Sequence, residues 1–123
     1  MLINFSHHVH TQWSEKQLQK AIDLYQEIID IPFPNVEPEG DEIYIQNLAD
    51  EYLNQILEIQ QQNADKSITV HLMGEYTFCF ALLKKLQAHN ITCVASTTKR
   101  IVQMTEDQKK ISVFEFVQFR KFL

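Results

Sequence analysis

The strongest constraint in this sequence is the alternation of short apolar runs with longer segments of helical pattern. Four such runs occupy residues 2–5, 28–31, 68–73 and 91–95, and a longer, more polar segment separates each run from the next. Alternating strands and helices build mostly parallel sheets with right-handed crossovers. The sequence therefore predicts an α/β fold in which the four runs are strands that end at a common edge of one sheet.

The first two segments between these runs have clear helix signals. Ser14 is a favourable N-cap, and Gln17 stands where it can complete a capping box. In the second segment, apolar residues recur at spacings of three and four from Ile45 to Leu57, behind a cap at Asp41. This pattern predicts a long amphipathic helix that gives way to a polar turn over residues 60–66.

The third segment follows Gly74 and Glu75 and is predicted to be helical through Gln87, with Asn90 as a left-handed cap. Its apolar residues are spread over more than one side of the helix. That distribution is typical of a helix that is deeply buried or pressed against a second subunit.

The last third of the chain departs from the alternation. Ser96-Thr97-Thr98-Lys99-Arg100 is interpreted as a polar loop, and residues 101–104 and 111–119 as a closing antiparallel hairpin around a charged turn. We expect a single domain over residues 1–123 with a Rossmann-like α/β architecture. Its mostly parallel sheet would be flanked by three helices and followed by the C-terminal hairpin.

Charge and cysteine content narrow the range of functions. The formal net charge is -5, and long nucleic acids are bound mainly through clustered Lys and Arg, so nonspecific DNA or RNA binding is not expected. No apolar stretch reaches membrane-spanning length. Cys79 and Cys93 fit neither a metal knuckle nor a redox pair, and we expect both to be reduced core residues in a cytoplasmic protein.

Three polar loops follow predicted strands. In open parallel sheets, ligands bind beyond the carboxyl ends of the strands, where the strand order reverses. If the first, third and fourth strands are neighbours, these loops converge on one edge of the sheet. The loops are Ser6-His7-His8-Val9-His10, Met73-Gly74-Glu75-Tyr76-Thr77 and Ser96-Thr97-Thr98-Lys99-Arg100.

Two of these loops suit an anionic ligand. The hydroxyls of the Ser96–Arg100 stretch can donate hydrogen bonds to phosphate, and its two cations can neutralise charge, although the same residues suit a solvated turn. Gly74 lets a ligand approach the backbone at a helix N-terminus with free N–H groups. Glu75 is equally compatible with an ordinary first-turn acid.

The histidines give the weakest indication of a functional site. His7, His8 and His10 lack partners at metal-ligand spacing, so no metal site and no cofactor are predicted, and a solvated loop is the default. Their position still makes His7 and His8 candidates for ligand contact, with Asn4 at the end of the first strand as a possible neighbour. His71 is expected to be a core histidine with its hydrogen bonds satisfied.

Four segments resemble a small CRISPR-associated family that accompanies type III systems, similar to a stand-alone CARF (CRISPR-associated Rossmann-like) domain. The likeness spans nearly the whole chain. It is clearest in residues 2–7 (Leu-Ile-Asn-Phe-Ser-His), 71–75 (His-Leu-Met-Gly-Glu), 93–100 (Cys-Val-Ala-Ser-Thr-Thr-Lys-Arg) and 113–120 (Val-Phe-Glu-Phe-Val-Gln-Phe-Arg).

This resemblance implies a ligand and an assembly. The ligand would be cyclic oligoadenylate, the second messenger of type III antiviral defence, most simply cyclic tetra-adenylate, bound across the two-fold axis of a homodimer. Lys99 and Arg100 from two subunits would supply four cations, and the apolar third helix would supply the self-complementary interface.

Three activities are compatible with these features. A sponge would bind the ring and damp signalling by sequestration. A ring nuclease would cleave it without metal by attack of the ribose 2′-OH on the neighbouring phosphate, with His7, His8 or Lys99 as candidate catalytic residues. An interaction module without a small ligand would use the apolar third helix and the aromatic last strand. A dinucleotide enzyme ranks last, because the glycine fingerprint is missing.

Overall fold

The computed structural model describes residues 1–123 and shows an α/β fold with a five-stranded, mostly parallel sheet. The strand order is β2-β1-β3-β4-β5; β1 to β4 run parallel and β5 is antiparallel to β4. The predicted fold class, including three helices and a C-terminal antiparallel hairpin, is confirmed. The elements are β1 (Leu2–Phe5), η1 (His10–Gln12), α1 (Glu15–Tyr25), β2 (Ile28–Asp30), α2 (Glu42–Gln62), β3 (Thr69–Leu72), α3 (Tyr76–Ala88), β4 (Thr92–Met104) and β5 (Lys110–Lys121).

The helix boundaries follow the predicted caps. Ser14 Oγ accepts a hydrogen bond from Gln17 N at 3.2 Å, and Asp41 Oδ1 accepts one from Tyr44 N at 2.9 Å. Asn90 has φ 59°, the left-handed conformation expected after α3. The polar turn predicted over residues 60–66 begins too early, because α2 continues to Gln62; glutamine is a good helix former and prolongs the helix without an apolar side chain.

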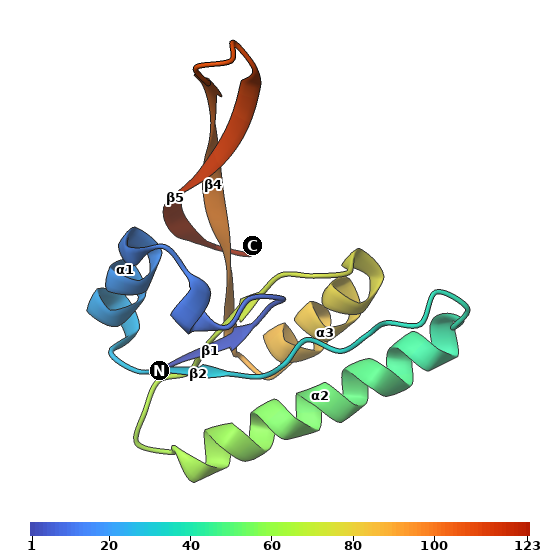
Figure 1. Ribbon diagram of the computed structural model, residues 1–123. Coiled ribbons are helices and arrows are strands. Elements are labelled where there is room, and N and C mark those ends of the chain that lie inside the picture. Colours follow the sequence, from blue (N-terminus) through green and yellow to red (C-terminus); the bar gives the residue numbers. More distant parts are fainter.

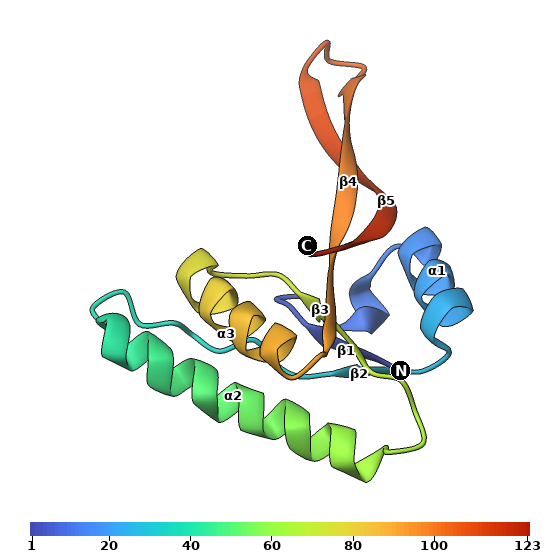
Figure 2. The same ribbon diagram turned by 180° about the vertical axis from the view of Figure 1, so that it is seen from behind.

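The two faces of the sheet are covered unequally. Helices α2 and α3 lie together on one face, and α1 lies on the other, as both views show (Figures 1 and 2). Strand alternation sends Ile3 and Phe5 into a core of 14 buried residues beneath α2 and α3. The opposite face has a core of only Leu2, Ala21 and Val94, against which Trp13, Tyr25, Ile28 and Phe119 pack.

The loop predicted at Ser96–Arg100 is wrong, because these residues are the middle of β4. The fourth apolar run and the first strand of the hairpin form one continuous strand, Thr92–Met104, so the sheet has five strands where the sequence suggested six. Hydrogen bonding to β5 satisfies the backbone along this stretch, and β-branched threonine favours extended structure. The hairpin extends far beyond the rest of the chain, away from α2 (Figure 1).

A β-bulge interrupts the pairing of β4 and β5. Thr97 pairs with Gln118 but Thr98 pairs with Phe116, so Val117 is an extra residue on β5. As a result, Phe116 and Phe119, three residues apart, point to the same face of the ribbon, and their ring centroids lie 4.9 Å apart.

None of the helices is both long and apolar enough to cross a membrane. Cys93 is buried and Cys79 is partly buried, and neither forms a disulfide. Burial raises the pKa of both thiols to about 12, so both remain protonated at neutral pH.

Candidate functional site

The sheet reverses its strand order between β1 and β3. The chain leaves β1 to build β2 on one side, and then crosses to build β3 on the other. The next strand outward is β4, so the predicted neighbourhood of the first, third and fourth strands is confirmed. Loops at the carboxyl ends of β1 and β3 lie at this reversal, which is where open α/β sheets bind ligands.

A cavity of about 520 Å³ opens at this edge on the α1 side of the sheet. It lies between the loop after β1, the start of α1, the end of β3 and the base of the hairpin. Its lining residues are Ser6, His7, His8, Gln12, Trp13, Ser14, Gln17, His71, Met73, Gly74, Ser96, Thr98, Phe114 and Phe116. Hydroxyls, imidazoles, amides and aromatic rings therefore line it, and none of the chain's 16 acidic residues does.

Asn4 organises the loop beside this cavity without lining it. Its side-chain N–H groups donate to His8 O and Asp30 Oδ1, both at 2.7 Å, and its Oδ1 accepts from Ser6 Oγ at 2.8 Å. The same oxygen lies 2.9 Å from His71 Nδ1. The amide nitrogen and oxygen of Asn4 therefore find their hydrogen-bond partners within the protein, and the side chain holds the Ser6–His8 loop in place.

His71 differs from the satisfied core histidine that the sequence suggested. It is 2 % exposed, and Nδ1 has its partner in Asn4, but Nε2 is buried without any hydrogen-bond partner. Burial lowers the pKa of this imidazole to about 4, so the ring is neutral at pH 7. The Trp13 and Phe119 rings pack against it nearly at right angles, with centroids at 5.4 and 5.6 Å.

The three histidines of the loop after β1 lie in two different environments. His7 and His8 line the cavity, and the His7 ring lies 4.5 Å from the ring of Phe33. His10 does not line it; its Nδ1 lies 2.7 Å from Asp30 Oδ2, and its backbone N–H donates to Asp30 Oδ1 at 3.0 Å. His10 therefore fastens η1 to the end of β2.

Strand geometry divides the Ser96–Arg100 stretch between two faces. Ser96 and Thr98 line the cavity, whereas Thr97 and Lys99 alternate to the other face. Arg100 returns to the cavity side opposite Phe114, but its guanidinium is bound to Ser112 Oγ through Nε at 3.1 Å and Nη2 at 2.9 Å. The expectation that Lys99 and Arg100 act together from one loop is therefore wrong for a single chain, since they point to opposite faces.

The N-terminus of α3 is already occupied. The Glu75 carboxylate accepts the backbone N–H of Thr77 at 3.0 Å and of Phe78 at 2.9 Å. Hydrogen bonds from Phe78 N and Thr77 N lower the pKa of Glu75, so the carboxylate is ionised and repels a second anion. Of the two alternatives for Glu75, the structure shows the helix cap, and its carboxylate occupies the N–H groups that an anion would use; Glu75 does not line the cavity.

Gly74 does line the cavity, and its lack of a side chain has a packing cause. A Cβ added there would lie 2.1 Å from Cζ of Phe33. The aromatic ring of the loop after β2 therefore requires glycine at this point, with or without a ligand.

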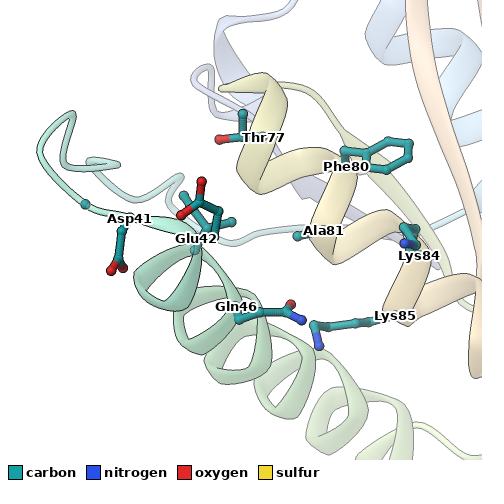
Figure 3. A pocket seen from close by; sticks show the side chains of 10 residues that line it. Asp41, Glu42, Gln46, Thr77, Phe80, Ala81, Lys84 and Lys85 are labelled. Atoms are coloured by element: carbon teal, nitrogen blue, oxygen red, sulfur yellow. The ribbon is translucent and has the colours of Figure 1, made fainter.

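Thr77 belongs to a different depression, a groove between the start of α2 and α3 (Figure 3). Asp41 and Glu42 lie at one end of this groove and Lys84 and Lys85 further along α3, so both signs of charge border it. Lys85 Nζ forms an ion pair with Asp50 Oδ1 at 2.8 Å. The groove contains no buried polar atom without a partner, which distinguishes it from the cavity at the strand ends.

Six of the twelve expected ligand-binding residues meet at the cavity: Ser6, His7, His8, Gly74, Ser96 and Thr98. The cavity is also lined by Trp13, Gln12 and Gln17, which were not predicted as site residues, although their place directly after the first loop was a usable signal. Two further lining residues that were not predicted, Phe114 and Phe116, come from β5 of the hairpin. No three His, Cys, Asp or Glu side chains gather where they could hold a metal ion.

Comparison with known proteins gives a family. The model of the uncharacterized protein MJ1673 family matches residues 1–120. The chain belongs to this family. No curated protein and no solved structure matches it. The matched region contains every residue that lines the cavity.

Proposed function

We propose that the cavity at the β1–β3 reversal binds cyclic oligoadenylate, most simply cyclic tetra-adenylate, between two copies of the chain, and that the protein damps a type III CRISPR signal by sequestering it. The observation that carries this proposal is the lining of the cavity. In a chain with net charge -5, a cavity lined by hydroxyls, imidazoles and aromatic rings, with no carboxylate, favours an anionic ligand with aromatic groups.

The aromatic part of the lining suits nucleobases. Trp13, Phe114 and Phe116 offer ring surfaces, and base–aromatic stacking contributes about 1–3 kcal/mol per base. The phosphates would be met by hydrogen bonds from Ser6, Ser96 and Thr98 rather than by a strong positive field. These donors act locally, which is consistent with a compact anion and an overall acidic chain.

A second copy of the chain is part of this proposal. The cavity volume lies within the range of small-ligand pockets, whereas a cyclic tetranucleotide has four nucleotide units and would extend beyond one such cavity. Two cavities related by a two-fold axis can share it. Arg100, on the hairpin beside Phe114, would reach the ligand at the rim of either cavity.

The hairpin and α3 provide surfaces for that second copy. A two-stranded ribbon is marginally stable alone, and this one exposes Val102, Met104 and Phe114 at 54 %, 60 % and 65 %. On α3, Tyr76 and Phe80 are exposed at 90 % and 63 %. Large exposed apolar side chains grouped in this way mark interaction surfaces.

The distribution of charge along the chain supports the pairing of two copies. Residues 99–123 contain six of the eleven Lys and Arg and three of the sixteen Asp and Glu, so this segment is basic. The remaining residues are strongly acidic. A basic hairpin of one chain and the acidic remainder of another are complementary, which supports a homodimer.

A ring nuclease is the second candidate, and the two imidazoles of His7 and His8 at the cavity favour it. One imidazole would accept the proton of the ribose 2′-OH as its oxygen attacks the adjacent phosphorus, the bond from phosphorus to the 5′-oxygen would break, and the other imidazole would protonate the leaving oxygen. The products would be linear chains ending in a 2′,3′-cyclic phosphate. The exposed apolar surfaces alone favour a third candidate, an interaction module without a small ligand.

One experiment separates the three candidates. The protein is incubated with cyclic tri-, tetra- and hexa-adenylate in EDTA, and binding is followed by native gel shift while the extracted nucleotide is analysed by chromatography. A shift with intact ring indicates a sponge, and linear product indicates a ring nuclease. If no ring binds or is cleaved, the proposed function is wrong and the interaction module takes its place.

A matched pair of variants locates the site. Trp13 and Tyr25 both pack on the Phe119 ring, with centroids 6.0 and 5.9 Å away, but only Trp13 lines the cavity. Trp13→Leu should therefore weaken ring binding about tenfold or more, while Tyr25→Leu should leave it unchanged. Equal effects from both variants would mean that the ring binds elsewhere.

A further inference from the structure

His71 Nε2 is the only buried side-chain nitrogen or oxygen in the structure without a hydrogen-bond partner. Such an atom destabilises the fold, because it has lost its hydrogen bonds to water and gained none in return. The residue borders the cavity at the strand ends, where a ligand can supply the missing partner.

The hydrogen-bond network around Asn4 fixes which proton His71 carries. Asn4 Nδ2 lies 2.7 Å from His8 O and from Asp30 Oδ1, and both of these oxygens only accept. Asn4 Oδ1 must therefore be the atom facing His71, and it too only accepts. The Nδ1 nitrogen of His71 then carries the proton, since it lies 2.9 Å from that oxygen.

A neutral imidazole has a single N–H. With the proton on Nδ1, Nε2 presents a bare lone pair, and burial keeps the ring neutral at pH 7 by lowering its pKa to about 4. Nε2 is therefore a preset hydrogen-bond acceptor, and a matching ligand atom must be a donor. Its low basicity suits recognition better than proton abstraction.

We propose that His71 Nε2 accepts a hydrogen bond from the exocyclic amine of an adenine base and makes the site selective for adenine over hypoxanthine. This inference rests on the proposed function. Hypoxanthine has a carbonyl oxygen where adenine has its amine, so two lone pairs would face each other. His71 is thus the specificity-determining residue of the cavity.

The surroundings of His71 favour a base over a sugar or phosphate. The Trp13 and Phe119 rings meet the imidazole at interplanar angles of 77° and 84°, and Phe116 packs on Phe119. A planar base can lie against these rings and direct its amine to Nε2. A ribose or phosphate would place polar groups against apolar ring surfaces.

The Trp13 ring packs on the imidazole with a centroid distance of 5.4 Å, so a base that approaches Nε2 from the cavity would also contact Trp13. This residue lies in the short connection between η1 and α1 and is only half-buried. It is the single tryptophan of the chain, so a change in tryptophan fluorescence reports on the surroundings of this residue.

The test is a fluorescence titration with cyclic tetra-adenylate, its inosine counterpart and its 2′-deoxy counterpart. Wild-type protein should bind the adenine ring about tenfold or more tightly than the inosine ring, because an unpaired buried acceptor is costly. His71→Leu should lose that preference, and His71→Gln, whose amide oxygen can accept, should recover part of it. His89→Leu, at the exposed end of α3, is the matched control and should bind as wild type does.

The outcomes separate this inference from the function on which it rests. Wild-type protein that binds no ring contradicts the proposed function, and this inference with it. Ring binding with the same adenine preference in His71→Leu contradicts the inference alone. If the 2′-deoxy ring loses as much affinity as His71→Leu does, the donor is the ribose hydroxyl and the assignment to the amine is wrong.

A second measurement applies if the His71 variants do not fold. The ¹⁵N shifts of the wild-type imidazole report its tautomer directly. A protonated Nδ1 and bare Nε2, with the Nε2 resonance moving on addition of the adenine ring but not of the inosine ring, support the proposal. A protonated Nε2 at pH 7 overturns it.

Discussion

The two faces of the sheet differ in what they bury. Beneath α2 and α3 lies a core of 14 buried residues, and the rings of its Phe5 and Phe78 pack against the partly buried rings of Phe33 and Tyr52. Beneath α1, three apolar residues are buried, and Asn4 and His71 are buried beside them. Stability is therefore concentrated on one face, whereas the polar network and the cavity occupy the other.

The largest effect should come from a truncation on the α2–α3 face. Phe78 is fully buried, and Phe78→Ala should lower the free energy of unfolding by about 3–5 kcal/mol, because it leaves a cavity among rings that cannot collapse. Denaturant unfolding followed by circular dichroism measures this loss. Any fraction that remains folded should bind ligand normally, and a selective loss of binding would break the division between the faces.

The next largest effect should be a loss of stability in acid that comes from the α1 face. The pKa of His71 is lowered to about 4 in the folded protein, below the unfolded value near 6.5. The unfolded chain therefore binds the proton first, and stability falls as the pH drops from about 6.5 to 4, by on the order of 3 kcal/mol. Unfolding measured from pH 7 to 4 should show this slope in wild-type protein, and His71→Leu should remove it.

Two neighbouring cations on the hairpin, Arg100 and Lys99, test which face of the ribbon meets the ligand. Arg100→Ala should weaken ring binding by about 1–3 kcal/mol, since a charge-assisted contact to phosphate would be lost. Lys99 is next to it in sequence but on the opposite face, so Lys99→Ala should have a much smaller effect. Titration calorimetry of both variants gives the difference, and equal losses would show that both faces of the hairpin meet the ligand.

The smallest effect should come from the cap of α3. Glu75→Ala should cost about 1 kcal/mol of stability, because the N–H groups of Thr77 and Phe78 lose their acceptor. Hydrogen bonds lower the pKa of Glu75, so this contribution is present above the pKa of the unfolded chain and is lost as the pH falls through the folded value. The affinity for the ring should not change in this variant, and a clear change would show that Glu75 contributes to the site.

The predictable parts of this molecule are those set by local pattern. Periodicity gave α2, and the caps at Ser14 and Asp41 gave helix starts, because each signal lies within a few residues of its effect. Residues 96–100 were predicted to be a loop because five polar residues in a row resemble one. They are part of a strand, because a two-stranded ribbon exposed on both faces does not need alternating apolar residues. The unpartnered nitrogen of His71 depends on the register of β1 against β3, and no local pattern contains that information.

The bulge at Val117 decides which side chains of β5 face the cavity. One extra residue keeps Phe119 in the small core under α1 while Phe116 and Phe114 face the cavity. If Val117 instead paired with Thr98 in a regular ladder, Phe116 and Phe114 would exchange faces and turn away from the strand ends. Deleting Val117 would leave Phe116 opposite Thr98 in a regular ladder, so the bulge lets β5 hold one residue more than β4 while its rings still line the cavity.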